Sequence, residues 1–450
     1  MIPHGPFFAR PDPTMTARRR MREAWKVSRP SGPSLIELLE PRLRADPVRF
    51  YQELHGRPPV YWDNRLRTWV VHRYADAVAA LRDPRYSARR LAIRLDSLPG
   101  TTQMRAQPLV KAMHRQMLFV DPPDHTRLRG LTGTHFTPRA IEGVRPLVAE
   151  ILGGLLAELG EPQTIDCMSA LADRLPVSVF ARMLGLPPEH QDQVRRWSRD
   201  FFVFLNGSPQ NADQSLRGLR SMANLLTYFQ HIGEGRLADP LGLFEILRRA
   251  MTDQDQITPA DLFTNYVFLF GAAHETTTSL IGSGLLRALR DPGLLTALRD
   301  DPALAESFVL ELLRRDPPVQ ITHRLATTNL RLGGAEIGQG ETVAIVLGAA
   351  NHDPDQFSDP YTFDPRRRPN HHLSFGYGIH HCLGAALARL ETSMVLRAFA
   401  ARFPAARLTG EQREWNEALF LRRIARLTIH LGPAAIASGN PVDTAPPVSE

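Results

Sequence analysis

The segment SFGYGIHHCLGAALARLE, residues 374–391, contains one of the two cysteines of this 450-residue chain. Cys382 follows two glycines and two adjacent histidines, and a run of helix-forming residues comes directly after it. Glycines permit a tight loop, and the N-terminal dipole of the following helix favours a thiolate over a thiol. The segment therefore predicts a reactive or metal-binding sulfur rather than a buried apolar side chain.

Such a thiolate could serve as a nucleophile, a zinc ligand or a haem ligand. A nucleophile needs a general base, and histidines one and two positions before the sulfur in a tight loop rarely point at it. A zinc site in this segment would require unusual ligand spacing, from His371, His372, His380 and Cys382. A single thiolate on haem iron favours O–O cleavage, and this alternative is the one we expect.

The stretch FGYGIHHCLG resembles the haem-ligand signature F-G-x-G-x-[H/R]-x-C-x-G of the cytochrome P-450 family and matches every specified position. The resemblance implies that Cys382 is the axial thiolate of haem b (iron protoporphyrin IX) and that His380 pairs with a haem propionate. It also implies a single-domain fold, mainly α with small β-sheets, in which haem lies between a long central oxygen-site helix and the cysteine-loop helix.

Further basic residues resemble the family's propionate ligands. In DPPDHTRLR, residues 121–129, His125 and Arg129 stand four positions apart and would share one face of a helix. The segment is similar to the family's D-P-P-[D/E]-H-T-R-L-R stretch, where both residues contact propionates. Arg324 in THRLATTNLRLGG resembles the family's propionate-binding arginine before a small sheet. Two propionates require several donors and cations, which these residues would supply.

A separate set of charged residues resembles a structural network of the family. Glu311 and Arg314 in ELLR form an i, i+3 pair, and Arg367 lies at the third position in FDPRRRPN. The resemblance implies a buried Glu–Arg–Arg network near the haem loop, with a structural rather than catalytic role. The neighbouring Arg366 and Arg368 are alternatives for the third member.

Acidic Glu275 beside Thr276 is unexpected in the apolar stretch FGAAHETTTSL, residues 270–280. A carboxyl group and an alcohol can together deliver protons to a reacting oxygen. The stretch resembles the family pattern [A/G]-G-x-[D/E]-T-[T/S], which implies a catalytic role for both residues. It departs from that pattern at Ala273, where the family has glycine, so a methyl group would lie close to the oxygen site.

These residues need elements to position them. Helical periodicity appears at about 139–160, 213–235, 259–290, 303–315 and 383–403, and short β-like pieces lie near 58–72, 321–347 and 425–431. Strands and helices do not alternate regularly, which argues against a doubly wound sheet or a barrel. We predict a flexible basic N-terminal tail at 1–32, a haem domain at 33–432 and a disordered C-terminal tail at 433–450.

Composition excludes several classes of protein. The net charge of +7 comes with no basic stripe interleaved with aromatics, so no nucleic-acid partner is expected. No apolar run is long enough to span a membrane, and no signal peptide is recognisable, so we expect a cytoplasmic protein without a membrane partner. Two cysteines, Cys167 and Cys382, cannot form a disulfide framework or a four-thiolate metal site.

The resemblance implies a haem-thiolate monooxygenase of the bacterial type. It would insert one oxygen atom from O2 into a hydrophobic small molecule, by hydroxylation or epoxidation, with a polyketide, macrolide or terpenoid of secondary metabolism as the expected substrate. Electrons would come from a ferredoxin or flavodoxin and its NAD(P)H-dependent reductase, and we expect a monomer. Alternatives are coupling, desaturation or peroxide-driven oxidation at the same haem, or a non-enzymatic haem sensor or carrier. Substrate contacts are expected from residues 87–117, 199–210, 268–272 and 318–322 and from Phe420 and Leu421.

Overall fold

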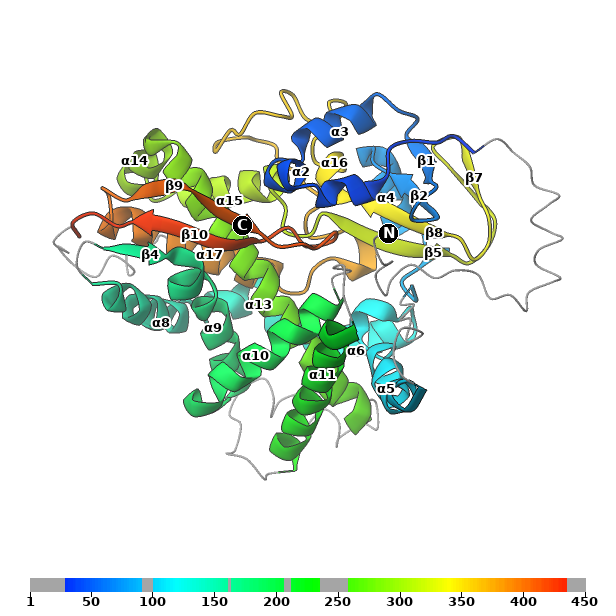
Figure 1. Ribbon diagram of the computed structural model, residues 1–450, viewed down its shortest axis with the longest axis horizontal. Helices are drawn as coiled ribbons and strands as arrows, with labels where there is room; N and C mark the ends of the chain where they lie inside the picture. Colours follow the sequence, from blue (N-terminus) through cyan, green and yellow to red (C-terminus); the bar gives the residue numbers. More distant parts are fainter. Residues whose placement is uncertain (1–28, 91–99, 161–162, 206–211, 235–257, 435–450) are drawn as a thin grey trace.

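The structure is a computed structural model that describes residues 29–90, 100–160, 163–205, 212–234 and 258–434 (Figure 1). Of the predicted tails, residues 1–28 and 435–450 lie outside the described residues. Residues 29–32 pack on the fold, because Arg29 forms an ion pair with Glu341 at 2.6 Å and lies over the ring of Trp62. The folded domain therefore includes these four residues, which the sequence analysis assigned to the tail.

Helices make up most of the described secondary structure. The first part of the chain forms η1 (Leu35–Leu39), α2 (Pro41–Ala45), α3 (Val48–His55), α4 (Tyr74–Arg82), α5 (Gly100–Met113), η2 (Met117–Phe119), α6 (Asp124–Gly133), η3 (Thr134–Phe136), α7 (Pro138–Glu142), α8 (Arg145–Glu158), η4 (Met168–Ala172), α9 (Arg174–Leu184), α10 (Pro188–Leu205) and α11 (Ala212–Gly233). The second part forms α13 (Pro259–Arg290), α14 (Pro292–Asp300), α15 (Leu304–Arg315), α16 (Leu347–Ala350), η5 (Gly378–His380) and α17 (Ala385–Arg402).

The strands form small separate sheets. The five-stranded sheet has the spatial order β1 (Val60–Asp63), β2 (Thr68–Val71), β8 (Thr342–Val346), β5 (Ile321–Ala326) and β3 (Tyr86–Ser87). Its β2–β8 pair is parallel and its other pairs are antiparallel. The antiparallel three-stranded sheet has the order β4 (Thr164–Asp166), β10 (Ile424–His430) and β9 (Arg407–Trp415), and β6 (Leu330–Leu332) pairs with β7 (Ala335–Ile337) in a hairpin.

Helix α13 runs through the middle of the molecule (Figure 1). It begins with a capping box, in which Thr258 and Asp261 each accept a hydrogen bond from the other's backbone, and Pro259 occupies its first turn. It packs against α9, α10, α11, α14 and α17, and its side chains are buried on nearly all sides. The main apolar core forms around this helix, which explains why its sequence is apolar over its whole circumference.

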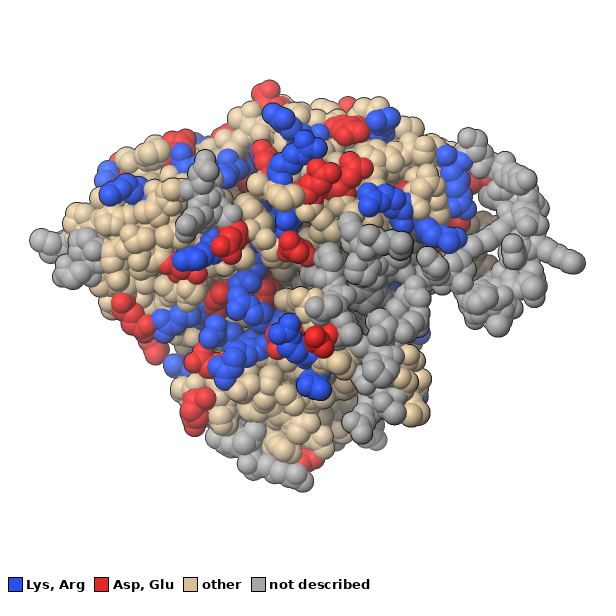
Figure 2. Space-filling view, in the orientation of Figure 1, with Lys and Arg blue, Asp and Glu red and all other residues tan. Residues whose placement is uncertain are grey.

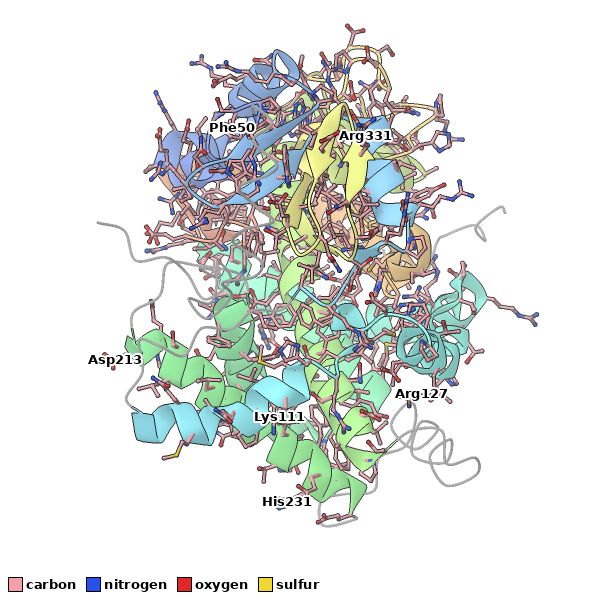
Figure 3. The ribbon with its side chains drawn as sticks, turned by 90° about the vertical axis from the view of Figure 1, so that its right-hand side faces the viewer. Phe50, Lys111, Arg127, Asp213, His231 and Arg331 are labelled. Carbon is pink, nitrogen blue, oxygen red and sulfur yellow. The ribbon has the colours of Figure 1, made fainter. Side chains whose placement is uncertain are left out.

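The five-stranded sheet and the helices α10 and α11 lie at opposite ends of the molecule. Figure 3 shows Phe50 and Arg331 in this sheet-containing part and Asp213 and His231 in the helical part. Two further apolar clusters, one around Trp69 and Val71 and one around Tyr51 and Val70, pack on the sheet. Because adjacent strand residues point to opposite faces, both faces of β2 are buried.

The predicted fold class, mainly α with small sheets, is confirmed. The helical ranges predicted at 213–235, 259–290, 303–315 and 383–403 correspond to α11, α13, α15 and α17. The range 139–160 divides into α7 and α8, which are separated by Gly143 and Val144. Within the described residues, no helix is long and apolar enough to cross a lipid bilayer.

Candidate functional site

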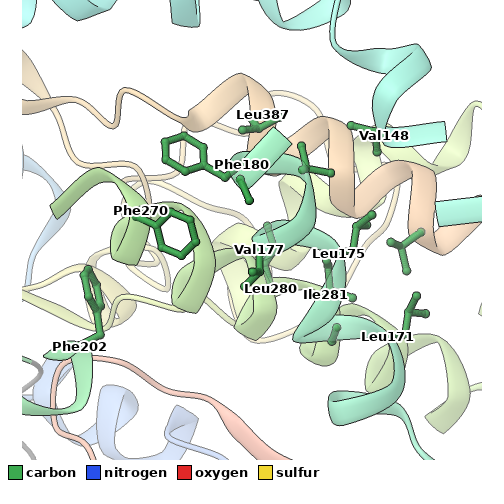
Figure 4. Close-up of a cluster of buried hydrophobic side chains, with 14 of the residues drawn as sticks. Val148, Leu171, Leu175, Val177, Phe180, Phe202, Phe270, Leu280, Ile281 and Leu387 are labelled. Carbon is green, nitrogen blue, oxygen red and sulfur yellow. The ribbon is translucent and has the colours of Figure 1, made fainter. Parts of the chain in front are cut away.

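A cavity of about 370 Å³ lies between α13 and the loop 374–384. Most of its wall is aromatic or aliphatic, and the aromatic rings come from Phe119, Phe136, Phe180, Phe202, Phe268, Phe375 and Phe420. Figure 4 shows Phe180, Phe202, Leu280 and Leu387 of this wall within the buried cluster that joins α9, α10, α13 and α17. The four ranges predicted to contact substrate and Phe420 contribute lining residues, whereas Leu421 does not line the cavity.

Apart from hydroxyl groups such as that of Thr276, the polar side chains of the cavity wall are mostly basic. Among the described residues that line it there is no aspartate or glutamate, whereas the basic side chains are Arg90, His125, Arg129, His323, Arg324, His380 and His381. Such a wall favours a ligand that is largely apolar and carries negative charge at one edge.

Cys382 faces this cavity from a loop that begins after β8 and α16. The Cys382 amide donates to the Phe375 carbonyl at 2.7 Å, and Gly376 and Gly378 have φ angles of +72° and +73°. Only glycine adopts such angles without strain, so these two residues allow the tight turn. Cys382 is exposed and is part of the cavity wall. Burial raises the pKa of the Cys382 thiol, while a hydrogen bond from the Gly384 amide and the charge of Arg129 act against this effect.

The cysteine loop is held by a residue that the sequence analysis missed. Asn351 accepts a hydrogen bond from the Leu373 amide at 2.7 Å and donates to the Ser374 hydroxyl at 2.8 Å. Ser374 in turn donates to the Leu313 carbonyl at 2.6 Å, so the start of the loop is tied to α15. Asn351 is fully buried, which makes these bonds costly to lose.

The structure brings Glu311, Arg314 and Arg367 together. Arg314 donates to both carboxylate oxygens of Glu311 at 2.8 Å, and Arg367 Nε lies 3.2 and 3.1 Å from the same two oxygens. Arg314 also donates to the Asn351 carbonyl at 2.9 Å. Glu311 and Arg314 are fully buried, so this network connects α15 to the segment that fixes the cysteine loop.

His125 and His380 come from distant parts of the chain and meet at the cavity. Their ring centroids are 4.2 Å apart, and the buried Nε2 atom of each has no hydrogen-bond partner among the described residues. Burial lowers the pKa of both, that of His380 to about 2, with additional contributions from Arg324 to His380 and from Arg129 to His125. Two unpartnered imidazole nitrogens at one place indicate a missing polar ligand.

The predicted arginines lie at the same cavity. Arg129 follows His125 by one turn of α6, and Arg324 is 4% exposed on β5. Burial lowers the pKa of both guanidinium groups, that of Arg324 to about 10, and neither forms an ion pair with a described carboxylate. Buried cations without counter-charges are unfavourable, so the site is incomplete without an anion.

The residues present fit haem b. A planar apolar group with two carboxylates matches an apolar cavity whose polar edge holds unpartnered imidazoles and unpaired guanidinium groups. Cys382 supplies a single sulfur at the cavity wall, which is the ligand set of a haem thiolate.

The two residues of the predicted catalytic pair, Glu275 and Thr276, lie on different sides of α13. Thr276 lines the cavity and donates to the Ala272 carbonyl at 2.7 Å, and Ala273 lines the cavity beside it. Glu275 is 2% exposed and is not part of the cavity wall. Its carboxylate lies 3.7 Å from Arg423 Nη1. Adjacent positions on a helix point in different directions, so the two side chains do not meet.

Glu275 belongs to a second buried charged cluster. Arg423 on the segment entering β10 forms an ion pair with Asp173, and Asp173 lies 3.4 Å from Arg199. One Glu275 oxygen has no hydrogen-bond partner among the described residues, and His274 Nδ1 is 3.7 Å away from it. The sequence analysis missed this cluster, because its members come from four separate segments.

Comparison with known proteins agrees with this site. A family model described as Cytochrome P450 matches residues 177–427. 6-deoxyerythronolide B hydroxylase from Saccharopolyspora erythraea is 35% identical over 398 residues, which cover 86% of this chain and 96% of the relative. Polyketide biosynthesis cytochrome P450 PksS from Bacillus subtilis is 32% identical over 366 residues, which cover 81% of this chain and 89% of the relative.

A solved structure shows the same fold. P450BioI, in complex with an acyl carrier protein ligated to hexadec-9Z-enoic acid, has a TM-score of 0.79 and 30% identity, and the match covers 87% of this chain and 100% of that chain. The family match spans more than half of the chain, and it includes the cavity helix and the cysteine loop. The chain therefore belongs to the cytochrome P450 family, whose members bind haem b through a cysteine thiolate, and it is a cytochrome P450 monooxygenase.

Proposed function

We propose that this enzyme inserts one oxygen atom from O2 into a hydrophobic small molecule, by hydroxylation or epoxidation, with Cys382 as the axial haem ligand. The observation that carries the proposal is one cavity lined by both Cys382 and Thr276, with basic side chains at its polar edge. Bound haem supplies the iron at which O2 is activated, and its thiolate ligand favours O–O cleavage.

The predicted cofactor-binding and proton-delivery residues each have a role in this proposal. His125, Arg129, Arg324 and His380 bind the two carboxylates of the cofactor through ring N–H and guanidinium donors. Thr276 holds a proton at its Oγ1 on the cavity side of α13. Glu275 supplies protons to that alcohol, which requires its carboxylate to leave the Arg423 side of the helix or a water to connect them.

We infer that the substrate is a hydrophobic secondary metabolite such as a polyketide, macrolide or terpenoid. The aromatic and aliphatic wall of the cavity supports a large apolar ligand. A relative of this chain carries the name of a polyketide biosynthesis enzyme, and another that of a 6-deoxyerythronolide B hydroxylase. Screening candidate metabolites for a change in the haem spin state would identify ligands that reach the iron.

We propose a ferredoxin or flavodoxin, with its NAD(P)H-dependent reductase, as the electron donor. The chain has a net charge of +7, and Lys and Arg side chains gather near the middle of the face in Figure 2, with acidic side chains among them. Positive surface favours encounter with an acidic carrier. We also expect a cytoplasmic monomer, which cell fractionation and size-exclusion chromatography would test.

A spectroscopic experiment tests the central assignment. The reduced protein with carbon monoxide should show the red-shifted absorption band of thiolate-ligated haem, and Cys382→Ala should abolish it. Cys167→Ala is the matched control, since Cys167 is fully buried outside the cavity. A folded wild-type protein that binds haem without this band would refute the proposal.

Other uses of the same haem are separable by their requirements. Peroxide-driven oxidation would proceed with hydrogen peroxide and without an electron donor, whereas the proposed reaction requires O2 and reductase. Coupling or desaturation would give products that contain no oxygen from ¹⁸O2. A sensor or carrier would bind haem and consume no reducing equivalents with any substrate.

A further inference from the structure

The cavity wall contains more arginines than the family resemblance assigns. Arg90, Arg129 and Arg324 line the cavity, and no described aspartate or glutamate does. Haem b brings two carboxylates, and Arg129 and Arg324 are the arginines that its family resemblance accounts for. Arg90 is a third guanidinium group at the same cavity, and neither the sequence motifs nor the proposed function assigns it a role.

Arg90 is held in place from two sides. Its Nη1 donates to the Ala88 carbonyl at 3.2 Å and to the Leu118 carbonyl at 3.3 Å. Its guanidinium carbon lies 5.2 Å from the centre of the Phe119 ring. Phe119 and Leu118 also line the cavity, so these contacts hold the guanidinium at the cavity wall. Both hydrogen bonds use Nη1, and Arg90 itself is part of the cavity wall.

No described carboxylate pairs with Arg90. Asp121 is the acidic group that acts on it electrostatically, but Asp121 accepts hydrogen bonds from Ser87 and from the Ala88 amide and lies 3.7 Å from Arg89. Burial, followed by the nearby charge of Arg324, lowers the pKa of Arg90 to about 9. A guanidinium group held at the wall of a largely apolar cavity without a counter-charge is unfavourable unless an anion joins it.

The adjacent Arg89 provides a comparison for Arg90. Arg89 has a side chain that is 56% exposed, and it lies near Asp121 and Asp124 at 3.7 and 3.4 Å. It does not line the cavity. The contrast between these neighbours places Arg90, and not Arg89, in the ligand-binding region.

We propose that Arg90 is a carboxylate-binding residue of the cavity, which receives either a haem propionate or the acid group of a substrate. Both sources present the same chemistry, since a planar guanidinium binds a carboxylate through paired N–H donors. The proposal rests on the proposed function, because it requires that the cavity holds haem and substrate.

The test compares Arg90→Gln with the matched control Arg89→Gln, both as holoenzyme. Haem loss is measured by transfer to apomyoglobin, and ligand binding is measured by spectral titration with lauric acid and with its methyl ester. If Arg90 binds a propionate, Arg90→Gln should lose haem about tenfold faster than wild type. If it binds a substrate acid, the variant should lose a preference of about tenfold for the acid over the ester, with haem loss unchanged.

Either result supports the proposal and names the source of the carboxylate. Arg90→Gln that behaves like wild type and Arg89→Gln in both measurements would overturn it. Arg90→Lys, which keeps a cation but not the planar fork, provides a second variant if Arg90→Gln does not fold, and it should show the same change in smaller measure. Failure of the proposed function is distinguishable, because wild-type protein would then lack the thiolate-haem band with carbon monoxide.

Discussion

Thr276 and Glu275 are neighbours in the chain but face different environments. One turn of an α-helix takes 3.6 residues, so consecutive side chains are about 100° apart. Thr276 is consequently at the cavity, and Glu275 lies among Arg423, His274 and the core. In the proposed reaction, Thr276 would therefore deliver protons directly, and Glu275 would act only through a change of its side-chain conformation or through a water.

We predict that Thr276→Ala retains haem and substrate binding but wastes reducing equivalents as hydrogen peroxide. The substitution removes the only side-chain oxygen of residue 276 at the cavity wall, so protons reach the reacting oxygen less effectively. Product formed per NAD(P)H consumed should fall about tenfold or more. Thr276→Ser is the control, since it restores a hydroxyl at the same position. An unchanged ratio in the alanine variant would exclude a proton-delivery role.

At position 273 we predict a separable effect on stability and on chemistry. Ala273→Gly should lower the free energy of unfolding by about 1 kcal/mol, because glycine in a helix interior loses more backbone entropy. Removal of the methyl group from the cavity wall should also change the ratio of product to NAD(P)H consumed. Urea unfolding and coupling assays on the same preparation measure the two effects. If only stability changes, the departure from the family glycine has no chemical consequence.

At the scale of secondary structure, several helices could be predicted from the sequence. The apolar residues of α11 and α15 recur with helical period because each helix buries a face, whereas α13 and α17 are buried on most sides. In α10 the end of the helix reads Asp-Phe-Phe-Val-Phe-Leu. Phe202 and Leu205 belong both to the core and to the cavity wall, so the sequence alone does not separate core residues from cavity residues here.

Other features of the site had no local signal. Asn351 contacts Leu373 and Ser374, which are 22 and 23 positions away, so no spacing rule connects them. Arg90 stands beside Arg89 in the sequence, and only burial distinguishes the two. Cys382 and His380, by contrast, lie within one short motif, and the structure places both at the cavity that their spacing suggested.

The connection between α15 and the cysteine loop gives a prediction at the same scale. Glu311→Gln should lower the free energy of unfolding by about 3–5 kcal/mol, because it leaves the fully buried Arg314 without its counter-charge. Haem content should fall as well, since Arg314 contacts Asn351, which holds the loop. Urea unfolding and the haem-to-protein ratio measure these effects. The control is Glu306→Gln, an exposed residue on α15, and equal behaviour of both variants would refute the link.

At the scale of the whole molecule, buried titratable groups in different parts of the fold together affect how the stability of the protein changes with pH. His72 on the sheet side, His274 in α13 and His352 after α16 are each at most 2% exposed. Burial lowers their pKa values to about 4, 3 and 3. In α17, burial raises the pKa of Glu391 to about 8. Histidines that fold neutral and an acid that folds protonated have opposite effects on stability as the pH changes.

We predict that acid destabilises the protein between pH 6.5 and about 5. In this range the unfolded chain binds protons at the three histidines and the native protein does not, so each costs about 1.4 kcal/mol per pH unit. Glu391 offsets one of these contributions above pH 4.5, because its native form already holds a proton that the unfolded form releases. Together these four groups should contribute a net loss of about 3 kcal/mol per pH unit, a large part of the stability of a typical domain. Urea midpoints at pH 7.5, 6.5 and 5.5 measure this loss of stability.

His72→Gln should reduce the slope of unfolding free energy against pH by about 1.4 kcal/mol per unit, whereas His371→Gln, an exposed control, should leave that slope unchanged. A slope that both variants share with wild type would show that His72 does not contribute to the acid sensitivity.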